Sequence, residues 1–358
     1  MNKILIITIR SHGSGGLDSV SKEMVKALYE IGVQTTVYGV APTRSFLGFL
    51  SDVLKIRKLA RSFDIIHALD GWPLGVYGWW AVVGTQKKLF INGLGSYTIS
   101  PLYQKFKKYW LRRAYERARK IFCVSHYTEV RILERLPYLK NTLVVYMGTN
   151  FIPKVSPKDV ARVRTEFNLE NVKKAMITVG DIKYRKGQLD ALKAMNLLKT
   201  KYPDIHYLIV GNDEDREYVK SIKDFAESND LSDRVHILSN VRSVNDLSAL
   251  YLLSDFYIMI SNNYGLFGEY FEGFGLVFLE AASLGLPVLG SSDCGIEDAL
   301  RDGYNGHLAK QGDIADISLA IEKIYQSNRG VLSSNSKKFA GEFSWQKMAL
   351  EFKKQYLE

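Results

Sequence analysis

The chain has 358 residues, of which 46% are hydrophobic and 24% are charged, a composition that excludes a largely disordered, collagen-like or coiled-coil protein. This length predicts two domains, and two cysteines are too few for a disulfide framework. Residues 1–150 hold 22 Lys and Arg against 9 Asp and Glu, a net +13 within a total of +10, which predicts an anionic partner for the first half.

The first residues and the longest apolar stretch bear on localisation. The start, Met1-Asn2-Lys3, runs directly into a strand-like segment without the layout of a signal peptide. The nearly uncharged stretch 71–84 is shorter than the roughly 20 residues that a membrane-spanning helix needs. We therefore expect a cytoplasmic protein that does not cross the membrane.

Strand-like and helical segments alternate along the chain. The first series begins with a strand at residues 3–9, a Gly/Ser loop and a helix at 19–31 that ends before Gly32. Its further strands are predicted at residues 35–40, 64–69, 88–92, 121–125 and 143–146. Ser125 is the expected N-cap of a helix that reaches Arg135.

A second series follows Pro153 and Pro157. Its strands are predicted at residues 175–180, 206–211, 235–238, 256–261 and 287–290, with helices between them. Alternating strands and helices imply parallel sheets covered on both faces. We therefore predict an α/β protein of two doubly wound, Rossmann-like domains facing across a cleft, residues 1–152 and 153–343, with a C-terminal helical segment, 344–358, packing back on the first domain.

The strongest motif is EGFGLVFLE, from Glu272 to Glu280. Ligands of open α/β sheets bind beyond the carboxyl ends of the strands, and here two carboxylates flank a Gly-x-Gly turn that opens an apolar helix. The turn lets backbone N–H groups approach a phosphate at the positive end of the helix. Glu280 can accept hydrogen bonds from a ribose diol, and Glu272 from sugar hydroxyls. An unrelated surface glutamate beside a tight turn and a core helix would show the same spacing.

With its continuation, EGFGLVFLEAASLGLPV, this segment resembles the E-x7-E signature of retaining GT-B glycosyltransferases of family GT4, also called glycosyltransferase group 1. The order of the other motifs is similar to that family: a GSGG loop after the first strand, VGDIKYRKG, IVGN and DGYNGHLA. The resemblance implies a GT-B fold. It also implies transfer of a sugar from a nucleotide-diphosphate sugar to an acceptor hydroxyl with retention of configuration.

The resemblance assigns roles to residues on the donor side. Lys186, in VGDIKYRKG, matches a family lysine that holds the diphosphate, where a fixed cation stabilises the leaving group as its charge grows. Asp181 stands where the family has an arginine, so Arg185 or Lys183 would substitute, although a solvated position is favoured for Lys183 alone. We expect Lys186, Arg185 and Glu272 to be catalytic. The expected donor-binding residues of this half are Gly180, Gly273, Phe274, Gly275, Leu276 and Glu280.

Fewer residues are assigned in the first half. Gly15 and Gly16 do not form the dinucleotide fingerprint GxGxxG, and by resemblance they let the backbone approach the donor phosphate and the acceptor. Asn92 stands in a loop where family members usually have a histidine, so histidine roles are not transferred, but Asn92 can still donate to a sugar hydroxyl. Of the six histidines, His126 is expected to face the cleft because it follows the strand at 121–125.

We expect no metal and no cofactor, because Lys, Arg and a helix dipole take the place of a metal in neutralising the diphosphate. The expected substrate is a UDP- or GDP-sugar. The sequence Asp213-Glu214-Asp215 matches the metal-binding DxD of the other large glycosyltransferase fold. However, it lies at the start of a predicted helix, where the dipole favours acidic residues.

The segment Tyr103–Lys120 is predicted to be one basic amphipathic helix with eight Lys and Arg, and Phe106 and Trp110 recur at helical spacing within it. It is typical of an interfacial membrane segment, although a surface helix with one face on the core would look the same. No nucleic-acid-binding motif accompanies it. We expect docking on the anionic inner face of the cell membrane and a lipid-linked or cell-surface polysaccharide precursor as glycan acceptor. The aromatic run 72–80 is expected to pack in the core over at least half of its length.

Two alternatives remain open. The first is a sugar phosphorylase or a nucleotide-sugar epimerase on the same fold. The second is a non-catalytic anion-binding protein with a degenerate donor site, which the departures at Asp181 and Asn92 leave possible.

Overall fold

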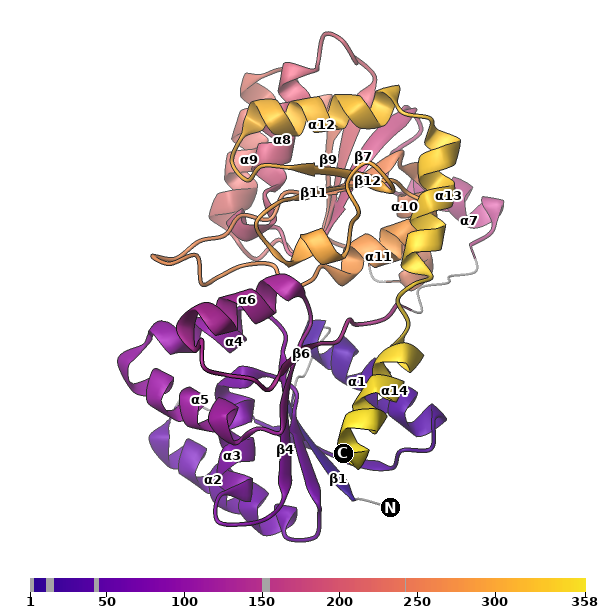
Figure 1. Ribbon diagram of the computed structural model, residues 1–358. Helices are drawn as coiled ribbons and strands as arrows, with labels where there is room; N and C mark the ends of the chain where they lie inside the picture. Colours follow the sequence, from indigo (N-terminus) through magenta and orange to yellow (C-terminus); the bar gives the residue numbers. More distant parts are fainter. Residues whose placement is uncertain (1–2, 11–15, 42–44, 150–154, 242) are drawn as a thin grey trace. The chain divides into compact units, whose positions relative to one another are not determined.

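Runs of aliphatic residues form the central strands of two parallel sheets (Figure 1). The computed structural model describes residues 3–10, 16–41, 45–149, 155–241 and 243–358. The chain divides into two compact units, unit 1 with residues 1–148 and 344–358, and unit 2 with residues 149–343. The predicted α/β class with parallel sheets is confirmed, because each unit holds a six-stranded sheet whose strand pairs are parallel.

The sheet of unit 1 has the strand order β2-β1-β3-β4-β5-β6. Its strands are β1 Ile4–Ile9, β2 Thr35–Val40, β3 Ile65–Ala68, β4 Lys88–Gly93, β5 Lys120–Cys123 and β6 Thr142–Val144. All four residues of β3 are buried, as expected of a strand covered on both faces, whereas β2 lies at an edge and is partly exposed.

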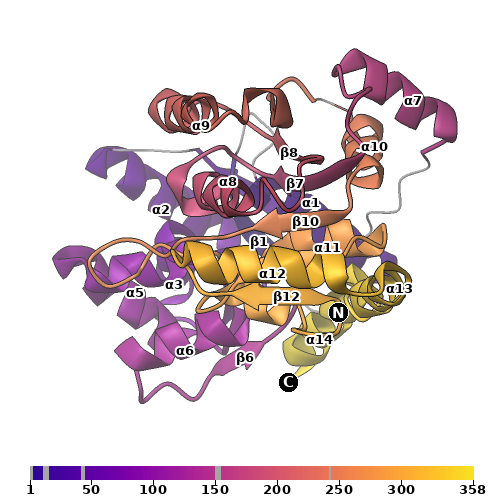
Figure 2. The same ribbon diagram turned by 90° about the horizontal axis from the view of Figure 1, so that it is seen from above.

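Helices cover both faces of this sheet (Figures 1 and 2). They are α1 Gly16–Glu30, α2 Phe46–Ala60, α3 Val76–Val82, α4 Ser96–Ile99, α5 Lys105–Arg117, α6 His126–Arg135 and α14 Trp345–Leu357, with short helical turns η1 Gly71–Gly75 and η2 Ser100–Tyr103. α2 packs on α3 and α3 on α5, while α14 packs beside α1 on the other side of the sheet. The C-terminal helix therefore completes the core of unit 1, where Phe352 stacks on Phe122.

The sheet of unit 2 has the order β12-β11-β10-β7-β8-β9. Its strands are β7 Lys174–Val179, β8 Ile205–Val210, β9 Val235–Leu238, β10 Phe256–Met259, β11 Val288–Ser291 and β12 Gly306–Ala309. Its helices are α7 Pro157–Glu166, α8 Gln188–Leu197, α9 Arg216–Ser228, α10 Val244–Leu253, α11 Leu276–Ser283, α12 Ile314–Gln326 and α13 Arg329–Ala340, with turns η3 Tyr184–Lys186, η4 Ser232–Arg234 and η5 Gly295–Asp298. The strand order reverses between β7 and β10, which is the position where open α/β sheets bind ligands.

Local capping predictions are confirmed, but several boundaries differ. The Ser125 hydroxyl accepts a hydrogen bond from the Thr128 N–H at the start of α6, and Gly32 after α1 has φ +78°. α1 begins earlier than predicted, at Gly16, and the strand β12 is additional. The aromatic run before α5 is buried over at least half of its length, as predicted: Leu74, Val76 and Tyr77 are core residues.

The prediction of one helix over Tyr103–Lys120 is wrong. The helix α5 spans only Lys105–Arg117, since Tyr103 ends η2 and Lys120 is already in β5. Its buried residues are Leu111, Ala114 and Tyr115, whereas Phe106 is 80% exposed. Contacts with α3 and the turns η1 and η2, rather than the spacing of the aromatics, decide which face of α5 is buried.

Candidate functional site

The loop after β7 is held against the end of β10 by backbone packing. Gly187 has φ +65°, and a Cβ added there would lie 1.8 Å from the carbonyl oxygen of Ile260. The carbonyl of Arg185 accepts hydrogen bonds from the Ser261 hydroxyl at 3.0 Å and from the Asn262 N–H at 2.9 Å. Two loops that are far apart in sequence therefore meet where the sheet order reverses.

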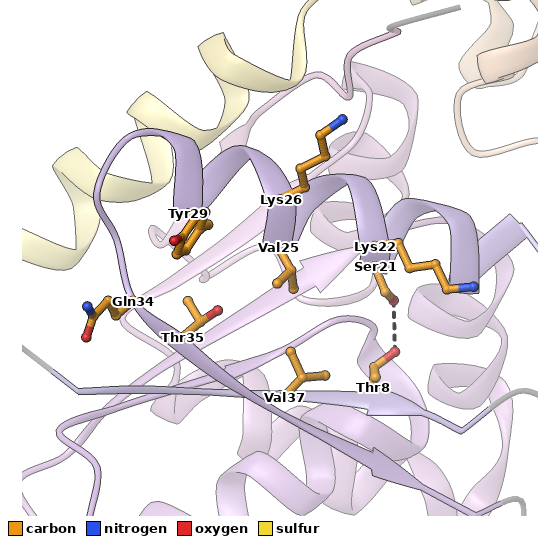
Figure 3. Close-up of a pocket in the computed structure, with 9 residues that line it drawn as sticks. All are labelled: Thr8, Ser21, Lys22, Val25, Lys26, Tyr29, Gln34, Thr35 and Val37. Atoms are coloured by element: carbon orange, nitrogen blue, oxygen red, sulfur yellow. Dashed lines mark hydrogen bonds between the residues drawn. The ribbon is translucent and has the colours of Figure 1, made fainter.

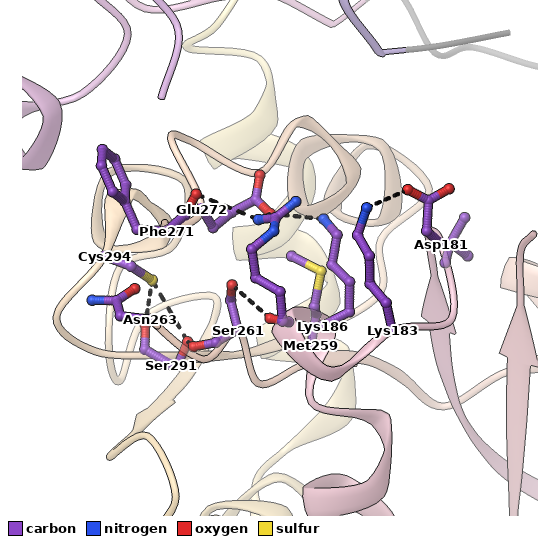
Figure 4. A network of polar contacts seen from close by, with 12 residues as sticks. Asp181, Lys183, Lys186, Met259, Ser261, Asn263, Phe271, Glu272, Ser291 and Cys294 are labelled. Atoms are coloured by element: carbon purple, nitrogen blue, oxygen red, sulfur yellow. Dashed lines mark hydrogen bonds and ion pairs between the residues drawn. The ribbon is translucent and has the colours of Figure 1, made fainter. Parts of the chain in front are cut away.

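Three of the predicted residues form one ionic cluster in this place (Figure 4). The Glu272 Oε2 accepts hydrogen bonds from Arg185 Nη1 at 2.8 Å and from Lys186 Nζ at 2.7 Å. The side chains are 15%, 20% and 12% exposed, respectively, so the pairs are shielded from water without being sealed off. One carboxylate faces two cations, and the cluster keeps a net positive charge that suits an anionic ligand.

The ionisation of this cluster follows from its contacts. Burial would raise the pKa of Glu272, but the charges of Lys186 and Arg185 outweigh it and hold this pKa at about 2. Burial lowers the pKa of Lys186 from its ordinary value, and the Glu272 charge opposes that effect. We conclude that Glu272 is ionised near neutral pH and orients both cations.

Asp181 and Lys183 do not join the cluster. The Lys183 ammonium lies 2.6 Å from the Asp181 carboxylate, and both side chains are more than a third exposed (Figure 4). The solvated position favoured for Lys183 is thus what the structure shows. Asp181, in the position that departs from the resembled family, neutralises Lys183 rather than Arg185 or Lys186.

The turn Gly273-Phe274-Gly275 leads from the cluster into α11. Phe274 is buried, and Gly275, with φ +87°, precedes the helix without a side-chain cap. A Cβ on the neighbouring Gly295 would lie 1.9 Å from the Gly273 carbonyl oxygen, so the turn is closely packed. The Phe278 N–H donates to the Gly275 carbonyl at 2.9 Å. The N–H groups of Leu276 and Val277 have no partner within the helix and are suited to bind a phosphate.

Glu280 lies one turn into α11 and is partly buried. In the part of the chain that the structure describes, no hydrogen bond or ion pair reaches its carboxylate. Burial raises its pKa to about 7. A shielded carboxylate without a partner is suited to accept hydrogen bonds from ligand hydroxyl groups.

The residues of unit 1 that were predicted for the site do not form one cluster among the described residues. Asn92 is 4% exposed, and its Oδ1 lies 2.8 Å from His67 Nε2, while His67 Nδ1 lies 2.6 Å from the hydroxyl of Tyr356. His126 begins α6, is exposed, and its Nδ1 lies 3.0 Å from the hydroxyl of Tyr146. Gly16 is the first residue of α1, and Gly15 lies outside the described residues.

Asp70, which the sequence analysis missed, is a buried carboxyl group at the end of β3. It accepts hydrogen bonds from the Gly71 N–H at 2.7 Å and from the Thr98 hydroxyl at 3.0 Å. Burial raises its pKa to about 7. The available sequence signal was its position directly after a buried strand; in the structure it holds the segment after β4 in place.

Asp213 and Asp215 have structural partners. Asp215 caps α9 by accepting a hydrogen bond from the Tyr218 N–H at 3.2 Å, and Asp213 forms an ion pair with Arg216 at 2.7 Å. Among the described residues, no group of three His, Cys, Asp or Glu side chains could hold a metal ion. The interpretation of this acidic run as a helix start is confirmed.

A groove of about 720 Å³ lies between α1 and the strands β1 and β2 (Figure 3). Its walls include Val25, Val37 and the hydrogen-bonded pair Thr8 and Ser21, whereas the ammonium groups of Lys22 and Lys26 point away from it. None of the predicted site residues that the structure describes lines this groove. The candidate site therefore rests on the cluster and α11 in unit 2.

Comparisons with known proteins agree with these observations. A family model described as glycosyl transferases group 1 matches residues 159–339, and one described as Glycosyltransferase Family 4 matches residues 14–151. An uncharacterized glycosyltransferase of Methanocaldococcus jannaschii is 25% identical over 99% of this chain and 98% of its own. A GDP-mannose-dependent alpha-(1-6)-phosphatidylinositol monomannoside mannosyltransferase of Mycolicibacterium smegmatis is 26% identical over 85% of this chain and 70% of its own.

Among solved structures, the Anabaena protein HepE in complex with UDP and glucose resembles this chain over the full length of both, with a TM-score of 0.81 and 20% identity. This likeness shows the fold, which is the predicted GT-B fold. No helix within the described residues is both long and apolar enough to cross a membrane.

Proposed function

The chain belongs to the glycosyl transferases group 1 and is a GT-B glycosyltransferase, and on this premise we propose that it moves a sugar from a nucleotide-diphosphate sugar to an acceptor hydroxyl with retention of configuration. The observation that carries the donor side is the contact of Glu272 with both Arg185 and Lys186. The UDP complex of the structurally similar HepE supports a nucleotide-sugar donor, and UDP- or GDP-sugar is the class that we propose.

In this proposal, different residues of unit 2 bind the ribose and the diphosphate of the donor. Glu280 accepts hydrogen bonds from the ribose, and the backbone N–H groups at the start of α11 bind a phosphate. Lys186 and Arg185 bind the diphosphate, whose negative charge increases as the glycosidic bond breaks, so that these fixed cations stabilise the transition state more than the ground state.

Glu272 has two functions in this proposal. It holds the two cations in place, and its second oxygen, Oε1, accepts a hydrogen bond from a hydroxyl of the transferred sugar. Because the cations and the start of α11 neutralise the diphosphate, the proposed reaction needs no metal. Retention is proposed from the E-x7-E resemblance, with Glu272 and Glu280 at the two acidic positions.

The local structure of Asp181 weakens the non-catalytic alternative. This carboxylate pairs with Lys183 at the surface and leaves both Arg185 and Lys186 to Glu272. The phosphorylase and epimerase alternatives are not favoured by the names of the relatives, which are glycosyltransferases.

We further propose a lipid-linked or cell-surface polysaccharide precursor as acceptor, presented at the inner face of the cell membrane. The name of the mycobacterial relative includes phosphatidylinositol monomannoside, which is a lipid. The helix α5 carries six Lys and Arg against one Glu, which suits an anionic membrane surface.

Three measurements test this function. Thermal unfolding is followed with UDP, GDP and their sugars, because a ligand at about 100 times its dissociation constant stabilises a protein by about 2.7 kcal/mol. Release of nucleoside diphosphate is then measured with and without membrane lipid extract, and the anomeric configuration of the product is determined by NMR. Release that does not depend on any acceptor, or an inverted product, would contradict the proposal.

A further inference from the structure

We propose that α2 and α5 together form a bilayer-contact surface, in which leucines of α2 enter the apolar layer of an anionic membrane while cations of α5 bind its headgroups. This inference rests on the proposed membrane-linked acceptor and identifies the part of unit 1 that reaches the lipid. It differs from the sequence-based expectation, which placed the membrane contact in the segment Tyr103–Lys120 alone.

The first observation is an exposed stripe of leucines on α2. Leu47 is 77% exposed, Leu50 44% and Leu54 61%, and their spacing of three and four residues places them on one side of the helix. The other side of α2 is buried through Val53 and Ile56. Because α2 packs on its own unit through the opposite side, these three leucines are not required to hold the helix in place.

The second observation is an exposed aromatic and basic stripe on α5. Phe106 is 80% exposed and Tyr109, one turn later, is 53% exposed. Exposed cations surround these two rings: Lys105, Lys108, Arg112 and Arg113. The Arg113 guanidinium lies 5.5 Å from the centre of the Tyr109 ring, so charge and aromatic surface are presented together.

The helix α3 lies between α2 and α5, and the three helices form one layer over a single face of the sheet (Figures 1 and 2). Phe49 of α2 stacks on Tyr77 of α3, with 4.9 Å between the ring centres. Arg57 Nη1 of α2 donates a hydrogen bond to the Trp80 carbonyl at 2.6 Å. On the other side, Trp110 of α5 packs against Trp80 at 5.7 Å. These contacts hold α2 and α5 in a fixed relation to each other.

The chemistry of the surface favours a lipid bilayer over a protein partner. Leucine and aromatic side chains with lysine and arginine around them are the composition of interfacial membrane segments. The single acidic residue of α5, Glu116, is engaged by Arg112 at 2.7 Å. On α2, Lys55 and Lys58 are exposed while Asp52 is buried. The free charge of the surface is therefore positive, and it complements anionic headgroups.

The test is sedimentation of the full chain with vesicles that contain phosphatidylglycerol, without any donor present. The variant Leu47→Gln/Leu50→Gln/Leu54→Gln is expected to bind at least about tenfold more weakly than wild type, because most of the buried apolar area is lost. Its dependence on salt is expected to stay that of wild type. The matched control is Leu197→Gln/Leu319→Gln, which replaces leucines of α8 and α12 that are 61% and 48% exposed, and it should bind like wild type.

A second variant separates charge from apolar insertion. Neutralising Lys105, Lys108, Arg112 and Arg113 to Gln should flatten the salt dependence while leaving the leucines in place. Thermal unfolding confirms that each variant is folded, and Leu47→Gln alone is used if the triple variant is not. Light scattering without vesicles reports whether the leucines mediate self-association.

Three results would overturn the inference: wild type that does not bind anionic vesicles, a leucine variant that binds as wild type does, or a leucine variant that changes only self-association. Nucleotide binding and nucleoside diphosphate release are measured on the same variants. Vesicle binding is measured without a donor, so the membrane surface can be confirmed even if the proposed transferase reaction is not observed. The transferase reaction can likewise be confirmed even if the protein does not bind vesicles.

Discussion

The ammonium group of Lys186 donates a hydrogen bond to the carboxylate of Glu272 at 2.7 Å, although the two residues are 86 positions apart. This contact joins the loop after β7 to the segment before α11, at the point where the strand order of unit 2 reverses. Each residue supplies the condition for the other: the cation keeps the carboxylate ionised, and the carboxylate makes a buried cation tolerable.

Lys186→Ala is expected to lower turnover by about 10²–10³-fold, the loss expected when one stabiliser of transition-state charge is removed. The rate of nucleoside diphosphate release with acceptor at saturating donor measures it. Lys183→Ala is the matched control, because that ammonium pairs with Asp181 at the surface, and it should keep near-wild-type turnover. Near-wild-type turnover of Lys186→Ala would indicate that Arg185, rather than Lys186, makes the contact with the diphosphate.

Glu272→Gln is expected to destabilise unit 2 by about 3 kcal/mol near neutral pH, because it leaves two shielded cations without their counter-charge. The pKa of Glu272 is depressed from 4.5 to about 2, so its stabilising effect is complete above pH 4.5 and is lost as the pH falls to about 2. The difference in unfolding free energy between wild type and variant should shrink over that interval. A difference independent of pH would contradict the ion-pair origin.

Glu280→Gln is expected to stabilise the ligand-free protein by about 1–3 kcal/mol at pH 8 and to raise the donor KM. Burial raises the pKa of Glu280 from 4.5 to about 7, so the ionised form opposes folding increasingly as the pH rises from 4.5 through 7. Unfolding at pH 4 and pH 8 checks the first effect. The rise in donor KM is expected with little change in kcat, because a ribose contact stabilises the ground state and the transition state equally. An effect confined to kcat would exclude the ribose contact.

Gly187→Ala is expected to cost clearly more stability and activity than Gly312→Ala. Both glycines have positive φ, at +65° and +71°, so both substitutions carry a similar backbone strain. Only at Gly187 does the new Cβ meet an atom, the carbonyl oxygen of Ile260 at 1.8 Å, whereas Gly312 faces open space. Thermal unfolding and turnover of the two variants isolate the clash; equal losses would mean that close packing does not hold the site.

Tyr356→Phe is expected to cost about 1–2 kcal/mol of stability, because it leaves the buried Nδ1 of His67 without its hydrogen-bond donor. Burial lowers the pKa of His67 to about 4, so the ring is neutral near pH 7; with Nε2 donating to Asn92, its Nδ1 must accept from Tyr356. The control Tyr29→Phe removes a hydroxyl from a side chain that is 74% exposed and should be nearly neutral. Equal unfolding temperatures for both variants would argue against this arrangement.

The alternation of strands and helices, the parallel sheets and the position of the E-x7-E motif could all be predicted from the amino-acid sequence. These features depend on local patterns, such as the unbroken aliphatic run of β1, the Ser125 cap of α6 and the Gly-x-Gly turn before α11, whose physical causes lie within a few residues. Strand ends differed by one or two residues because pairing with a neighbouring strand decides where each strand stops.

The partners of individual side chains, in contrast, could be identified only in the folded protein. No local pattern pairs Glu272 with Lys186 and Arg185, turns Asn92 toward His67, or leaves Leu47 and Phe106 in water while Leu111 is buried. Such partners come from segments that are distant along the chain, and the packing of whole helices on a sheet sets which side of a helix is covered. The charge of a site and its shielding from water are therefore properties of the folded arrangement.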